Sequence, residues 1–400
     1  YKRIGEKIAD GSILSASVVK EGGAAAAVAK MCFGNKIGFE FTSHLSGEEL
    51  FRPCYGAFII ELNGAAADGE NVIGKTIEDY KILCRDYTVS LDNLQRVWEA
   101  KLEPVFPCRI KTTDTTPETY SNANRIQRSA SIKVAQPRVL IPVFPGTNCE
   151  YDTARAFERA GAKAETIVIR NLSASAIEES VNVFERAIKQ SQIIMLPGGF
   201  SGGDEPEGSG KFITAFFRNA KIKDAVHDLL KNRDGLMLGI CNGFQALVKL
   251  GLVPFGEIID MADDAPTLTF NTIARHQSMM VTTRIASNKS PWLYGCEVGD
   301  IHTIPISHGE GRFVAPDRII QQMANNGQIA TQYVDLDGNP TMDIRYNPNT
   351  SVEAIEGITS PDGRVLGKMG HSERIGSFVG KNVPGSKDQK IFESGVAYFK

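Results

Sequence analysis

A strand-to-helix turn centred on Cys241 is the sequence feature that most constrains the fold. Residues 235–240 are apolar and predict a buried strand, whereas the apolar residues after the cysteine recur at helical spacing up to Gly251. Gly239 and Gly243 stand two residues to either side, where larger side chains would clash in a sharp turn. The sequence therefore predicts a nucleophile elbow with cysteine in place of serine, at a helix N-terminus that favours thiolate over thiol.

The region after residue 137 alternates between strand and helix patterns. Strand patterns lie near residues 138–144, 164–169, 192–197 and 235–240. This alternation predicts an α/β domain, residues 138–400, in which helices cover both faces of a parallel sheet and ligands gather at the carboxyl ends of the strands. Residues 105–137 are rich in turn formers and predict a linker. Residues 1–104 mix short strand and helix patterns and predict a smaller α+β unit.

Composition limits the classes of partner and compartment. The chain has 400 residues, with 44 basic and 47 acidic side chains, and shows no basic stripe for nucleic acid. No apolar run approaches the roughly 20 residues of a membrane span. The seven cysteines form no C-x-x-C pair and no metal-ligand spacing, which predicts a reducing, cytoplasmic setting and no metal site. Cys149 lacks flanking glycines, so we interpret it as structural.

A glycine-rich stretch, residues 197–211, follows one of the predicted strands. It does not fit a phosphate-binding P-loop, because position 205 is Glu and Lys211 is followed by Phe. Such a loop can instead direct backbone N–H groups at a developing oxyanion, and Gly199 with the N–H of Asn242 is the predicted pair. The alternative is an ordinary surface loop.

A cysteine nucleophile needs a base, and two histidines have a carboxylate two residues later. These are His308 with Glu310 and His371 with Glu373. In an extended segment residues i and i+2 face the same side, so either carboxylate could orient its imidazole, and spacing alone does not choose. His371 follows an apparent hairpin over residues 358–367. The other histidines, at positions 44, 227, 276 and 302, are interpreted as surface or core residues.

These residues together carry a family resemblance. Gly239-Ile-Cys-Asn-Gly-Phe-Gln245 with a distant His371-x-Glu373 resembles the triad of class I glutamine amidotransferases. Over residues 138–400 the chain is similar to the glutaminase domain of the phosphoribosylformylglycinamidine synthase family, also called formylglycinamide ribonucleotide amidotransferases. The matching motifs are Phe144-Pro-Gly-Thr-Asn148, Pro197-Gly-Gly-Phe-Ser201 with Gly203-Asp204, Ser307-His-Gly-Glu-Gly-Arg312 and His371-Ser-Glu-Arg374.

The resemblance implies a flavodoxin-like fold and a role for each residue of the triad. Cys241 attacks the carboxamide of glutamine, His371 accepts and returns the proton, and Glu373 orients the imidazole. The resemblance also places the segment 308–312 near the glutamine pocket instead of in the triad. We therefore expect Gln245, His308 and Arg312 to be substrate contacts, with helix and loop structure as the competing explanation for Gln245 and Arg312. Ser372 replaces a proline that many relatives carry, with little expected effect.

The resemblance also implies a larger reaction. Residues 1–104 resemble the carboxyl-terminal half-domain of the aminoimidazole ribonucleotide synthetase fold, which precedes the glutaminase in single-chain members. Ammonia would pass to a synthetase centre, where ATP with Mg activates formylglycinamide ribonucleotide for amidine formation in purine biosynthesis. The chain begins at Tyr1 without an initiator Met, so most of that centre is expected upstream, in the remainder of the same polypeptide. The glutaminase step itself requires no cofactor.

Two alternatives of other classes stay open. Gly-x-Cys-x-Gly alone also fits a cysteine hydrolase of the α/β-hydrolase type. That fold expects its acid before the histidine in chain order, whereas Glu373 follows His371 here. The other alternative is a binding module with a silent active site.

Overall fold

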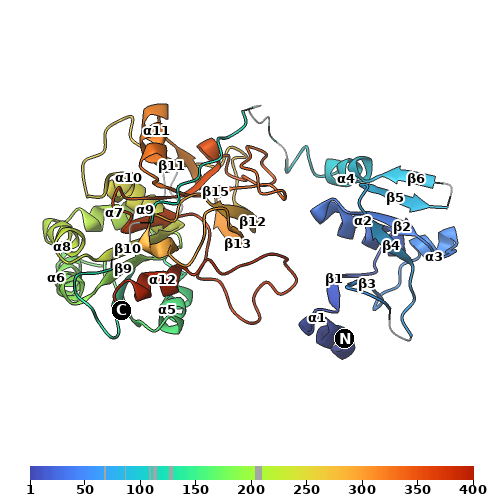
Figure 1. Cartoon of the computed structure of the whole chain (residues 1–400), viewed down its shortest axis with the longest axis horizontal. Helices are drawn as coiled ribbons and strands as arrows, with labels where there is room; N and C mark the ends of the chain where they lie inside the picture. The colour runs from blue at the N-terminus through green and yellow to red at the C-terminus, as the bar shows by residue number, and fades with distance from the viewer. Residues whose placement is uncertain (67–68, 86, 108–109, 111–114, 126–128, 203–209) are drawn as a thin grey trace. The chain divides into compact units, whose positions relative to one another are not determined.

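The computed structural model describes residues 1–66, 69–85, 87–107, 110, 115–125, 129–202 and 210–400. The chain forms two compact units (Figure 1). Unit 1 comprises Tyr1–Cys108 with Gly380–Val383, and unit 2 comprises Arg109–Val379 with Pro384–Lys400. Part of the predicted linker, residues 105–137, lies outside the described residues. Among the described helices, none has the length and apolar character needed to cross a membrane.

Unit 1 combines two small sheets with helices. Strand β1 (Ile13–Val18) pairs antiparallel with β3 (Phe58–Leu62). A second sheet has the order β4 (Gly74–Ile77), β2 (Gly38–Phe41), β5 (Lys81–Cys84), β6 (Tyr87–Ser90). The helices are α1 (Lys2–Ala9), α2 (Gly23–Asn35), α3 (Gly47–Phe51) and α4 (Leu91–Ala100). Apolar side chains of α2, α3 and α4 pack on β2 and β5 in one core, in which Leu91 is fully buried.

Unit 2 is built on one large mixed sheet. The strands β7 (Arg138–Val143), β8 (Lys163–Val168), β9 (Ile193–Leu196), β10 (Leu236–Ile240) and β17 (Val365–Lys368) are parallel. The four strands expected from the apolar patterns coincide with β7 to β10 within one residue at each end, and those predictions are confirmed. The antiparallel strands are β12 (Gln277–Ile285), β13 (Ile301–His308), β15 (Ile329–Tyr333) and β16 (Ile355–Thr359).

The prediction of a parallel sheet is therefore wrong for one side of it. The full order is β13-β12-β15-β16-β17-β10-β9-β7-β8, and the change from parallel to antiparallel comes between β17 and β16. The connection between β16 and β17 is residues 360–364. Such a short turn can join antiparallel strands, whereas a parallel neighbour needs a crossover of a dozen or more residues.

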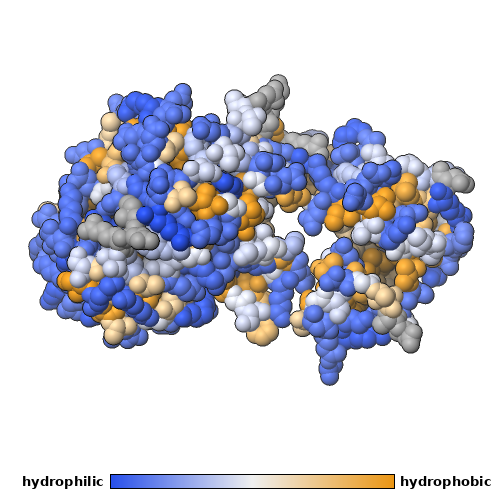
Figure 2. Space-filling view, viewed as in Figure 1, coloured by the Kyte–Doolittle hydropathy of each residue, from blue (hydrophilic) through white to orange (hydrophobic). Residues whose placement is uncertain are grey.

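Helices cover both faces of the parallel part. Helix α5 (Glu150–Arg159) packs with α12 (Ile391–Ala397) on one face. The other face carries α6 (Ala174–Gln190), α7 (Lys211–Phe217), α8 (Ala220–Lys231) and α9 (Asn242–Leu250), where α8 contacts α6 and α7, and α7 contacts α9. In Figure 1, α5 and α12 lie below β9 and β10, with α7 and α9 above. The visible face of unit 2 is mostly hydrophilic (Figure 2), because the apolar strands β9 and β10 are completely buried between these layers.

The remaining elements of unit 2 are short or peripheral. They are α10 (Leu252–Phe255), α11 (Asp317–Asn325), β11 (Thr267–Thr269), β14 (Arg312–Val314), and the 3-10 helices Pro291–Leu293 and Val352–Ala354.

The strand order fixes where a site can form. Numbered along the chain, the parallel strands β8-β7-β9-β10-β17 have the order 2-1-3-4-5, with a reversal between β7 and β9. Ligands in such sheets bind outside the carboxyl ends of the strands, near the reversal. The segments that begin there are those after Val143, Leu196, Ile240 and Lys368. All of the motifs singled out in the sequence near these strands thus lie at one edge of the sheet.

Candidate active site

Cys241 occupies a sharp turn between β10 and α9. Its backbone angles are φ 52° and ψ −107°, a left-handed conformation that is rare for a residue with a side chain. The N–H of Cys241 donates to the carbonyl of Lys368 at 2.9 Å, and its own carbonyl accepts from the N–H of Gln245 at 3.0 Å. The turn is therefore tied to β17 on one side and to the first turn of α9 on the other.

The two flanking glycines are required by close packing. A Cβ at position 239 would lie 2.5 Å from Leu247 Cδ1, and one at position 243 would overlap the carbonyl oxygen of Leu196. Helix α9 can start directly after β10 only because neither position carries a side chain. The predicted glycine-framed elbow is confirmed.

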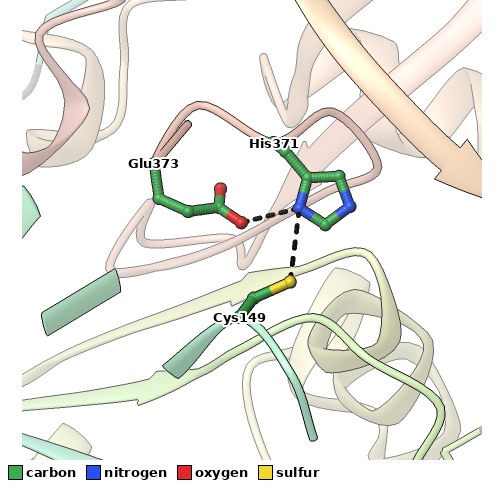
Figure 3. Close-up of side chains that lie close together, drawn as sticks. All are labelled: Cys149, His371 and Glu373. Atoms are coloured by element: carbon green, nitrogen blue, oxygen red, sulfur yellow. Dashed lines mark hydrogen bonds and ion pairs between the residues drawn. The ribbon is translucent and has the colours of Figure 1, made fainter. Parts of the chain in front are cut away.

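His371 and Glu373 form a buried hydrogen-bonded pair just after β17. The distance from His371 Nδ1 to Glu373 Oε1 is 2.6 Å, and both residues are 1% exposed. Figure 3 shows Nε2 on the side of the ring turned away from Glu373, and this nitrogen has no partner among the described residues. Because Nδ1–H donates to Glu373, Nε2 is the ring nitrogen that can exchange a proton with a thiol or a leaving group.

The pair also stabilises a proton on the imidazole. Burial lowers the pKa of His371, but the charge of Glu373 and the nearby thiols of Cys149 and Cys241 raise it by more, so that it lies well above its ordinary value of 6.5. Burial raises the pKa of Glu373, yet the charge of His371 holds it below its usual value. His371 can therefore take a thiol proton and keep it until a leaving group needs it.

His308, the other candidate base, differs from His371 in its pKa and in its hydrogen bonding. His308 is fully buried, and neither ring nitrogen has a partner among the described residues. Burial lowers the pKa of His308 to about 3, so its ring is neutral at physiological pH. Its ring packs so closely on position 311 that a Cβ there would overlap it. Within the described part of the chain, no hydrogen bond to a carboxylate orients His308 as Glu373 orients His371.

A second thiol, from Cys149, also lies beside His371. Its Sγ is 3.9 Å from His371 Nδ1 (Figure 3). Arg374 Nη2 donates to the same sulfur at 3.1 Å. Cys149 is buried, as a structural cysteine would be, but the interpretation that it is only structural missed its place in the site. Its position after β7, in the motif Phe144-Pro-Gly-Thr-Asn148, is the signal that could have placed it there.

Gly198 is the point where these side chains meet. A Cβ built on Gly198 would lie 2.7 Å from His371 Cε1, 3.1 Å from Cys149 Sγ and 3.5 Å from Cys241 Cβ. The sequence analysis included this residue in the motif Pro197-Gly-Gly-Phe-Ser201 but assigned a role only to its neighbour Gly199. Cys149 lies near Nδ1, and that nitrogen is already bonded to Glu373. The nitrogen without a partner is Nε2, which favours Cys241 as the thiol that gives up its proton.

The cluster could in principle suggest a metal. One ligand-type atom from each of Cys149, His371 and Glu373 lies within 4.8 Å of the other two, and this is the sole such group in the described part of the chain. The 2.6 Å bond between Nδ1 and Oε1 occupies two of these atoms, and the Arg374 guanidinium is bonded to the third. A guanidinium at the sulfur opposes a metal cation, so the cluster fits a hydrogen-bonded site better. The described part of unit 1 offers no group of this kind for Mg with ATP.

The predicted oxyanion donors are the chain neighbours of two residues of this centre, since Gly199 follows Gly198 and Asn242 follows Cys241. Gly199 has φ +144°, and a Cβ there would meet the carbonyl oxygen of Gly146 at 2.6 Å. Asn242 is the first residue of α9, where the helix leaves its N–H without an intrahelical acceptor. Asn242 Oδ1 accepts the N–H of Ser201 at 3.2 Å and so fastens the glycine-rich loop to the elbow. Gly203 and Asp204 of that loop lie outside the described residues.

The expected substrate contacts differ in their surroundings. Gln245 Oε1 accepts from Asn242 Nδ2 at 3.0 Å, and its Nε2 donates to the carbonyl of Glu310 at 2.5 Å, so Gln245 joins α9 to the segment 307–312. That segment also borders the thiol, since Cys241 Sγ lies 3.7 Å from the carbonyl oxygen of Ser307. Arg312 lies at the start of β14, which pairs with β11.

The chain is similar to known proteins over this same region. Residues 136–399 match the CobB/CobQ-like glutamine amidotransferase domain. Phosphoribosylformylglycinamidine synthase subunit PurQ of Methanococcus maripaludis (strain C7) is 38% identical over 247 residues, which cover 61% of this chain and 84% of that protein. The PurQ subunit of Aquifex aeolicus is 32% identical over 246 residues, which cover 62% of this chain and 92% of that protein. The solved structure of PurLQS from Thermotoga maritima is 26% identical with a TM-score of 0.48, covering 66% of this chain and 100% of that one.

Proposed function

The chain belongs to the CobB/CobQ-like glutamine amidotransferase family, among relatives of phosphoribosylformylglycinamidine synthase subunits, and from this premise we propose that it hydrolyses L-glutamine to glutamate and ammonia. The observation that carries the proposal is the convergence of the strained Cys241 elbow and the buried His371–Glu373 pair around Gly198. Family membership and the position of Glu373 after His371 disfavour the α/β-hydrolase alternative.

In the first half of the reaction, the Cys241 sulfur attacks the carboxamide carbon of glutamine while His371 Nε2 takes the thiol proton. The negative charge that develops on the carboxamide oxygen is stabilised by the N–H groups of Gly199 and Asn242. The tetrahedral adduct collapses when its C–N bond breaks and the imidazolium protonates the departing nitrogen. Ammonia leaves, and a γ-glutamyl thioester remains on Cys241.

In the second half, His371 removes a proton from water as the water oxygen attacks the thioester carbon. The C–S bond then breaks, the proton returns to the sulfur, and glutamate is released. Glu373 keeps the imidazole oriented and balances its charge in both halves, at the 2.6 Å distance observed. Each step uses the same base and the same pair of N–H donors.

The ammonia is proposed to serve the ATP-dependent conversion of formylglycinamide ribonucleotide to its amidine. The relatives that bear the synthase name support this use. The resemblance of residues 1–104 to the carboxyl-terminal half-domain of the aminoimidazole ribonucleotide synthetase fold supports unit 1 as part of the synthetase, and ATP with Mg would bind mainly elsewhere in that synthetase.

The glutaminase proposal is tested by incubating the chain with a diazo-ketone analogue of glutamine and locating the adduct by mass spectrometry. Such a reagent alkylates an activated thiol without needing the synthetase reaction. We expect one adduct on Cys241, blocked by excess glutamine and absent in Cys241→Ala, while Cys149→Ala is still labelled. An adduct on Cys149 that persists in Cys241→Ala would contradict the assignment of the nucleophile. Absence of any adduct on the folded chain would contradict the proposal itself.

A further inference from the structure

We propose that a buried ion pair, Lys368 with Glu356, is a positioning device that holds the segment carrying His371 against Cys241. The side chains of Lys368 and Glu356 are 1% and 0% exposed, and Lys368 Nζ lies 3.2 Å from Glu356 Oε1. A fully buried pair of opposite charges is costly to desolvate unless its remaining hydrogen-bonding capacity is used. Here that capacity is used on the residues on either side of His371.

Glu356 lies on β16 and holds the segment from one side. Its Oε1 accepts the N–H of Gly370 at 2.6 Å, and its Oε2 accepts the hydroxyl of Thr331 at 2.5 Å. A Cβ at position 370 would lie 3.0 Å from Oε1 and would overlap Ile304 Cδ1. Glycine therefore lets the backbone approach the carboxylate closely enough to be bound by it.

Lys368 holds the segment from the other side. Its Nζ donates to the carbonyl of Gly370 at 2.8 Å and to the hydroxyl of Ser372 at 3.0 Å. With Glu356 as the third acceptor, every N–H of the ammonium has a partner. Ser372 passes the contact on by donating to Gln389 Oε1 at 2.6 Å. The serine for which we expected little effect is thus part of this network.

Lys368 also connects the two halves of the proposed triad. Its carbonyl accepts the N–H of Cys241 at 2.9 Å, while its side chain binds the residues before and after His371. The N–H of His371 itself donates to the carbonyl of Pro305 at 2.9 Å. Lys368, at the end of β17, therefore fixes the position of the Cys241 turn relative to the segment that carries His371.

Stability alone does not require charges at this place. Replacing both members of a buried ion pair by uncharged groups of similar shape is often neutral for folding, whereas removing one member leaves the other charge unpaired. The double variant Lys368→Met/Glu356→Gln removes both charges, nearly preserves side-chain length, and keeps an amide oxygen for the N–H of Gly370. It separates positioning of His371 from folding.

The inference rests on the proposed glutaminase function, so the test measures the maximal rate of Cys241 alkylation by the diazo-ketone and the concentration that gives half of it. We expect the double variant to lose about tenfold or more in maximal rate, with the half-saturating concentration within about threefold of wild type. Ser372→Ala removes one contact and leaves the ion pair, so a smaller loss of maximal rate is expected. If the double variant does not fold, Ser372→Ala provides the test of the positioning role.

Arg364→Gln is the matched control. Arg364 lies before β17, at the end away from His371, and pairs with Asp234 at 3.4 Å, their side chains being 12% and 7% exposed. It should lower thermal stability and keep the wild-type alkylation rate. A folded double variant with the wild-type maximal rate, or an equal loss in Arg364→Gln at equal stability, would overturn the positioning role. Failure of the wild type to be alkylated would instead overturn the glutaminase proposal.

Discussion

Replacement of Gly198 by alanine tests the geometry of the candidate site directly. The new methyl group would stand 2.7 Å from His371 Cε1 and 3.1 Å from Cys149 Sγ. Ordinary van der Waals contacts begin near 3.4 Å, so the imidazole must move by roughly 0.7 Å. Misplacement of a catalytic group by about 1 Å can cost on the order of a hundredfold in rate. We therefore expect Gly198→Ala to reduce the maximal rate of Cys241 alkylation about a hundredfold, or about 2.7 kcal/mol in the barrier.

The assay compares this variant with Gly376→Ala, which lies on the segment after Glu373. A Cβ at position 376 has Val379 Cγ2 as its nearest neighbour, at an ordinary 3.7 Å. Circular dichroism and thermal unfolding establish that both variants are folded. Alkylation of Gly198→Ala within threefold of the wild-type rate would show that Gly198, His371 and the thiols do not meet as described.

Three further outcomes are expected. The pKa of His371 is raised in the folded state, so its ion pair with Glu373 contributes its full stability below pH 6.5 and loses it as pH rises through the folded-state pKa. The thermal unfolding temperature of the wild type should therefore fall from neutral to alkaline pH. Glu373→Gln should lose this part of the pH dependence. Lys368→Met leaves Glu356 buried without its cation, so urea unfolding should show a loss of about 3 to 5 kcal/mol, most of it regained when Glu356 is also replaced by Gln. Gly243→Ala should destabilise the protein by about 1 to 3 kcal/mol in the same assay, because its methyl group overlaps the end of β9; a neutral result would contradict the packing of the elbow.

Local patterns were sufficient for the parallel strands and the elbow. Strands β7, β9 and β10 are nearly continuous apolar runs because both of their faces are buried, and such runs are visible in a single sequence, whereas the edge strand β8 is only partly buried. The apparent hairpin over residues 358–367 is confirmed as the antiparallel pair β16–β17. The sequence analysis did not predict the antiparallel strands β12, β13 and β15, whose pairing depends on partners far away in the chain. Strand direction is a property of the connection as much as of the strand.

The sequence by itself determined the elements and their chemistry: a glycine-framed cysteine between a strand and a helix, and two histidines that each precede a carboxylate. Only the tertiary structure distinguished the bonded His371–Glu373 pair from His308, and only it brought Cys149, Gly198 and Cys241 around one imidazole. The physical reason is that periodicity and turn chemistry record whether a residue is buried and how its neighbours bend. The order of strands in the sheet decides which of those turns meet, as it does for Cys241 and Lys368, and no local pattern records that order.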